Sequence, residues 1–159
     1  MRKIDQLLEA YGESHQHTTN KTIHWVCVPL IFFSIVGLLF SIPAGPLLWL
    51  QFLLGNFANW ATLVLAVVLF YYVSISPPLA LGMLFFSSVC LALANLASIL
   101  LPIPLWAFSL AIFILAWIGQ FYGHKIEGKK PSFFQDIQFL LVGPAWLMHF
   151  IYKKFGFAY

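Results

Sequence analysis

The feature that most constrains this chain is a stretch of 103 consecutive residues, Thr22 to His124, that contains no Asp, Glu, Lys or Arg. Apolar runs of about 20 residues are already typical of membrane-spanning helices, and a soluble domain cannot keep a run of this length out of water. The whole chain is only 8% charged, whereas a soluble domain is about 25% charged. The sequence therefore predicts an integral membrane protein. It excludes a water-soluble enzyme, a disordered tail and a disulfide scaffold.

Prolines and glycines divide this stretch into apolar segments of helical length. We expect four transmembrane helices, over residues 23–42, 60–75, 79–101 and 105–122. The apolar segment 47–54 is short, and we interpret it as interfacial or re-entrant. In the fourth span, Gly119 and Gly123 have the small-xxx-small spacing that lets two helices approach closely. The expected fold class is an all-α integral membrane protein.

The N-terminal segment is predicted to form an amphipathic helix at the membrane surface. Its apolar residues recur at positions i, i+3, i+4 and i+7, which is the spacing of one helix face: Ile4, Leu7, Leu8 and Tyr11. Asn20 is a good N-cap for the next helix, which should begin near Lys21.

The C-terminal segment is predicted to form a second surface helix. Ser132 and Gln135 resemble the capping box that begins such a helix, and Pro144 should end it. A last short apolar segment follows, over residues 145–152.

The Lys and Arg side chains lie only near the two ends of the chain. Four spans bring both ends to one side of the membrane, and the positive-inside rule makes that side cytoplasmic. The membrane would be the inner membrane of a bacterium or the endoplasmic reticulum of a eukaryote. We expect one membrane domain over residues 1–159, with a surface segment at 1–20, a bundle at 23–122 and a cytoplasmic-face segment at 123–159. A net charge of +3 is too small for a nucleic-acid-binding protein.

The five histidines are the residues most suited to chemistry. None lies in the middle of a predicted span, and the topology gathers all five on one membrane face: His15, His17, His24, His124 and His149. Histidines at such a boundary are candidates for metal ligands or proton carriers. A single interfacial histidine is more often a polar anchor. Five in a chain so poor in polar residues make a metal site an equally good interpretation.

The spacing of the histidines restricts how they can meet. His15 and His24 are nine residues apart, so on one continuous helix they would point in nearly opposite directions. They can share a metal only if the chain folds back between them, and Thr18-Thr19-Asn20 is the expected break. His124 and Glu127 are spaced i and i+3, so they share one helix face if the fourth span continues that far.

Two motifs at the ends of the chain resemble those of a known family. The first is Tyr-x3-His-x4-Asn-x3-His followed by Val-Pro, which begins at Tyr11 and ends at Pro29. The second combines Gly123-His124, then Glu127, then Lys129-Lys130-Pro131. Together they resemble the membrane-embedded 2-hydroxy fatty acid dioxygenases.

This resemblance implies an activity and a set of site residues. Members of the family use ferrous iron, Fe(2+), and O2 to shorten a long-chain 2-hydroxy fatty acid by one carbon, in fungi at the endoplasmic reticulum during phytosphingosine breakdown. By position, it implies His15, His24 and His124 as iron ligands and Asn20 and Glu127 as catalytic or orienting groups. His17 and His149 remain open as further metal ligands. Neutral imidazoles suit iron, and three of them leave positions free for other ligands.

Two other functions remain open from the sequence. The chain could be a small transporter or lipid-binding protein whose histidines are interfacial or bind regulatory zinc, although its spans hold few of the midplane polar groups that transporters use. It could also be a zinc-dependent hydrolase, for which the metal would activate a water. The membrane desaturases and hydroxylases fit less well, because their histidine boxes need about eight histidines and this chain has five.

Overall fold

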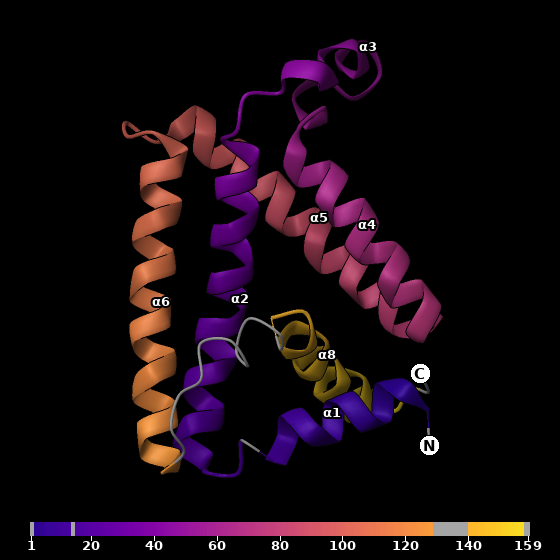
Figure 1. Ribbon diagram of the computed structural model, residues 1–159, viewed down its shortest axis with the longest axis vertical. Helices are drawn as coiled ribbons and strands as arrows, with labels where there is room; N and C mark the ends of the chain where they lie inside the picture. Colours follow the sequence, from indigo (N-terminus) through magenta and orange to yellow (C-terminus); the bar gives the residue numbers. More distant parts are fainter. Residues whose placement is uncertain (1, 14, 129–139, 158–159) are drawn as a thin grey trace.

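The computed structural model describes residues 2–13, 15–128 and 140–157, and this part of the chain is helical without a strand. This confirms the expected all-α fold class. The helices, shown in Figure 1, are α1 (Lys3–Glu13), α2 (Thr18–Phe40), η1 (Gly45–Leu50), α3 (Gln51–Leu54), η2 (Gly55–Phe57), α4 (Trp60–Ile75), α5 (Pro77–Leu100), α6 (Leu105–Glu127) and α8 (Val142–Phe155).

Most of the uncharged stretch forms long apolar helices. Three of them, α2, α5 and α6, are each long and apolar enough to cross a membrane. A fourth candidate span is α4 together with the preceding segment Gly45–Phe57, and these two parts meet at a bend of 84°. Because α4 has only 16 residues, it reaches about 24 Å, less than the roughly 30 Å of a bilayer core. Three to four membrane-spanning helices agree with the four that the sequence predicts.

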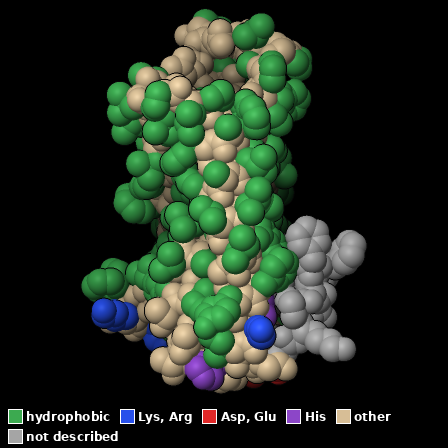
Figure 2. Space-filling model, turned by 90° about the vertical axis from the view of Figure 1, so that its left-hand side faces the viewer, with side chains coloured by type: hydrophobic (Ala, Val, Ile, Leu, Met, Phe, Trp, Pro, Cys, Tyr) green, Lys and Arg blue, Asp and Glu red, His purple; other side chains and the backbone are tan. Residues whose placement is uncertain are grey.

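The polar parts of the chain gather at one end of the molecule. In Figure 1, α2 rises from this end and α6 returns to it, while α1 and α8 lie across it. The short helices between α2 and α4 lie at the opposite end. Figure 2 shows hydrophobic side chains over the long upper part of one face and the visible Lys, Arg and His side chains at the lower end.

Close contact between α2 and α6 sets the geometry of this end. A Cβ atom on Gly119 would lie 2.6 Å from Sγ of Cys27, and one on Gly123 would lie 2.3 Å from Oδ1 of Asn20. Real side chains do not pack this closely, so a larger residue at either position would force Cys27 or Asn20 to move. The predicted close approach at Gly119 and Gly123 is confirmed, and α2 is its partner.

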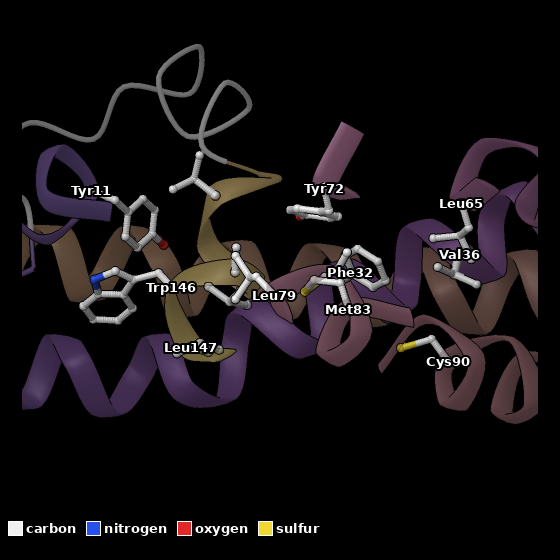
Figure 3. Close-up of a cluster of buried hydrophobic side chains, with 14 of the residues drawn as sticks. Tyr11, Phe32, Val36, Leu65, Tyr72, Leu79, Met83, Cys90, Trp146 and Leu147 are labelled. Atoms are coloured by element: carbon white, nitrogen blue, oxygen red, sulfur yellow. The ribbon is translucent and has the colours of Figure 1, made fainter. Parts of the chain in front are cut away.

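The short helices α1 and α8 pack against each other through apolar faces. Ile4, Leu8 and Tyr11 of α1 are buried, as is Trp146 of α8. Figure 3 shows Tyr11 beside Trp146 at one end of the buried apolar cluster, with their ring centroids 5.3 Å apart. The apolar face of α1, which the sequence placed against the membrane surface, is thus covered by α8.

The structure corrects two predicted helix boundaries. The helix α2 begins at Thr18, and its N-cap is His17, whose Nδ1 accepts a hydrogen bond from the backbone N–H of Thr19 at 3.2 Å. Asn20, the predicted cap, lies inside the first turn and is fully buried. Pro144 does not end a helix but lies in the first turn of α8, where a missing N–H costs nothing. The predicted C-terminal surface helix falls mostly outside the described residues.

Candidate metal centre

Three of the five histidines come together at the polar end of the bundle. His15 precedes α2, His24 lies in α2, and His124 lies in the last turn of α6. One ring nitrogen from each lies within 4.8 Å of the other two. The side chains are only 2%, 1% and 5% exposed, respectively. We call this set the histidine cluster. The break that lets His15 meet His24 is the segment before Thr18, three residues earlier than the sequence indicated.

Hydrogen bonds fix which nitrogen of His15 and His24 faces the cluster. Nδ1 of His15 lies 2.6 Å from the backbone oxygen of Tyr11, and Nδ1 of His24 lies 2.9 Å from that of Asn20. A carbonyl oxygen can only accept, so each Nδ1 donates and the lone pair of the neutral ring is on Nε2. Nε2 of His24 is buried and has no hydrogen-bond partner among the described residues. Metal-binding histidines have this arrangement, with the other ring nitrogen held by a carbonyl or carboxylate.

Ring packing adds to the fixed orientation of the cluster. The His15 ring stacks on Tyr11, with centroids 4.2 Å apart and planes 14° apart. The His24 ring meets His15 edge-on at 4.1 Å, and the His124 ring lies 5.1 Å from His24. Tyr11, which lies on the apolar face of α1 and begins the first motif, therefore supports the cluster directly.

Glu127 joins the end of α6 to the beginning of α2. Its Oε1 accepts the backbone N–H of Gln16 at 2.7 Å, and its Oε2 accepts the backbone N–H of His17 at 3.0 Å and the side-chain Nδ2–H of Asn20 at 2.9 Å. A carboxylate at a helix N-terminus is also favoured by the helix dipole. Glu127 thus links the end of α6 to the beginning of α2 beside the histidine cluster. It is not one of the three residues whose side chains could share a metal ion.

Asn20 connects Glu127 to the histidine cluster. Its side chain donates to Glu127, and its backbone oxygen receives the Nδ1–H of His24. The residue is 0% exposed and lies against Gly123. A change at Asn20 or Glu127 would therefore alter how His24 and His124 are held relative to each other.

The other two histidines lie apart from the cluster. His17 is exposed and caps α2. His149 is half-buried on α8, where its ring contacts that of Phe150 at 5.2 Å. The structure does not bring either into the group that could share one metal ion.

One buried polar residue near the cluster is among the few polar residues of the predicted spans, but nothing in the sequence assigns it a role at the site. Gln120 lies one turn before His124 on α6 and is 6% exposed. The i, i+4 spacing to His124 was the available signal, since it places both side chains on one helix face.

The donor set is suited to a transition metal. Three imidazole nitrogens suit zinc, copper or iron, and a set of three protein ligands leaves coordination positions open for other molecules. The fold and this cluster together define a class: an α-helical membrane protein with a buried three-histidine candidate metal centre at its polar end.

The chain belongs to the Mpo1-like family, since the family model described as 2-hydroxy-palmitic acid dioxygenase Mpo1-like matches residues 1–155. This confirms the resemblance carried by the two terminal motifs, and the family name implies a dioxygenase. Comparison with curated proteins and with solved structures gave no match.

Proposed function

We propose that this protein is an iron-dependent dioxygenase that shortens long-chain 2-hydroxy fatty acids by one carbon with O2. The observation that carries the proposal is the buried histidine cluster, in a chain that the family model matches from residue 1 to residue 155. His15, His24 and His124 would hold Fe(2+), with Nε2 as the donor atom of His15 and His24. Bound iron supplies the redox chemistry that lets O2 react with the substrate.

The protein's own residues would position the substrate and exclude water. Burial of all three histidines limits access of bulk solvent to the site. A 2-hydroxy acid carries two adjacent oxygen-bearing groups, which suit a site with several free positions. The cluster lies at the polar end of an apolar bundle, so the head of the acid can reach it while the acyl chain stays in apolar surroundings. Under the positive-inside rule, this end faces the cytoplasm.

A zinc-dependent hydrolase is the second candidate, because three histidines are also a catalytic zinc set. The two functions differ in the metal and in the need for O2. Only the dioxygenase requires a redox-active metal, since zinc neither gains nor loses electrons in proteins.

We expect the purified protein, loaded anaerobically with iron and then exposed to air, to consume O2 when 2-hydroxyhexadecanoic acid is added. Mass spectrometry should show a fatty acid one carbon shorter. Hexadecanoic acid, which lacks the hydroxyl, is the matched control and should give neither signal. Zinc-loaded protein should also be inactive. An iron-loaded protein that consumes no O2, or a zinc-loaded protein that turns the acid over, would refute the proposal.

A further inference from the structure

A small cavity adjoins the histidine cluster. It measures about 30 Å³ and lies between α1, α2, α6 and the beginning of α8. Its lining includes His24, Gln120, Trp117, Tyr11 and Gly143. A cavity of this size has room for about one water molecule or one hydroxyl group when polar partners are present.

The side-chain amide oxygen of Gln120 has no hydrogen-bond donor in the described part of the chain. Its Oε1 is buried and makes no hydrogen bond to any residue in 2–13, 15–128 or 140–157. A buried amide oxygen that lacks a donor is destabilising, so it points to a ligand that supplies one. A glutamine in a membrane bundle usually bonds to a neighbouring helix, but within residues 2–13, 15–128 and 140–157 no such bond is made by this oxygen.

The neighbouring His24 specifies the chemistry of that ligand. Its Nε2 is a second buried acceptor, and the residue lines the same cavity. With Nε2 occupied by a metal, Oε1 of Gln120 is still a buried acceptor without a donor among the described residues. A group that fits must therefore donate a hydrogen bond, and both water and the 2-hydroxyl of a hydroxy acid can do so through an O–H.

We propose that Gln120 is a positioning residue whose amide oxygen accepts a hydrogen bond from a hydroxyl group held in the cavity beside the histidine cluster. The hydroxyl comes either from a water molecule or from the substrate. The second source rests on the proposed function, because it assumes a 2-hydroxy acid as the ligand.

The test compares three variants with the wild type. Gln120→Met removes the acceptor at nearly the same size. Gln120→Glu keeps an oxygen at the same place and should restore what the methionine variant loses. Gln51→Met is the matched control, because Gln51 is exposed on α3 at the opposite end of the molecule (Figure 1). Each protein is loaded with Co(2+) without O2, and its metal affinity is measured first to show that the histidine cluster is intact.

Two binding measurements then separate the two sources of the hydroxyl. The first is the affinity for 2-hydroxyhexadecanoic acid relative to hexadecanoic acid. If the substrate supplies the hydroxyl, Gln120→Met should lower this preference about tenfold, the worth of one good hydrogen bond, while Gln51→Met leaves it unchanged. The second is the relaxation rate of solvent water protons in the metal-loaded protein, which reports a water held near the metal. If water supplies the hydroxyl, this rate changes in Gln120→Met and the preference does not.

The inference is overturned if Gln120→Met binds metal like the wild type and changes neither quantity. If the methionine variant does not fold, Gln120→Asn replaces it, because the shorter side chain withdraws the oxygen by one methylene. Should the wild type bind neither acid, the proposed function fails, and the water relaxation measurement alone decides the role of Gln120.

Discussion

Replacing His24 by alanine is expected to abolish stoichiometric metal binding by the purified protein, and with it any oxidation of 2-hydroxy acids. His24 supplies one of the three converging nitrogens, and its Nε2 faces the cluster with Nδ1 held by Asn20. Changes that only touch a ligand's partner already cost about 10- to 100-fold in metal affinity, so the loss of a ligand should exceed about 100-fold. His15→Ala and His124→Ala should behave alike. Titration with Co(2+), followed by its absorption spectrum, measures the effect.

The chain provides matched histidine controls for this experiment. His149→Ala should keep the affinity for metal, because His149 lies on α8 outside the cluster. His17→Ala should keep it as well and lose only the cap of α2, worth about 1 kcal/mol of stability. A His149→Ala variant that loses metal while His24→Ala retains it would show that the site has been placed wrongly.

Glu127→Ala is expected to weaken metal binding about 10- to 100-fold without removing any ligand. The carboxylate accepts hydrogen bonds from Gln16, His17 and Asn20, which fix the beginning of α2 against the end of α6. Without it, these donors lose their partner and His24 and His124 are no longer held in one geometry. Stability should also fall, by about 2 kcal/mol for lost bonds to a charged group. Thermal unfolding and Co(2+) titration of the same preparation measure both effects.

A second acidic residue and a double variant make this prediction specific. Glu9→Ala is the control, because Glu9 is exposed on α1 and its removal changes the net charge equally. Asn20→Ala should weaken metal binding as well, and the double variant should be less affected than the sum of the two, since both side chains belong to one network. Strict additivity would mean that Glu127 and Asn20 act separately, contrary to the hydrogen bond between them.

The spans could be predicted from the sequence because local features, namely apolar runs and the prolines that follow them, are enough to determine them. The helix over 60–75 was placed correctly from its apolar run and the prolines that follow it. The beginning of α2 lies earlier than predicted, because Asn20 is a preferred cap residue but the cap in the structure is His17. Asn20 instead packs against Gly123 on another helix, and no local pattern contains that contact.

The sequence predicts where the site lies, but only in part which side chains meet there. The five histidines lie near or beyond the two ends of the uncharged stretch, and the bundle brings those ends together (Figure 1). Which histidines then meet depends on helix rotation, which selects His15, His24 and His124 and leaves His17 and His149 apart. The sequence alone gives Gln120 no role, because its i, i+4 spacing to His124 indicates a shared helix face but not a shared cavity.

The most direct test of the central claim is the metal content of the wild-type protein, purified without added metal and analysed by mass spectrometry. The proposed function predicts about one iron per chain, and the same measurement on His24→Ala should find none. Stoichiometric zinc with no iron, or iron that remains bound in the His24→Ala variant, would contradict it.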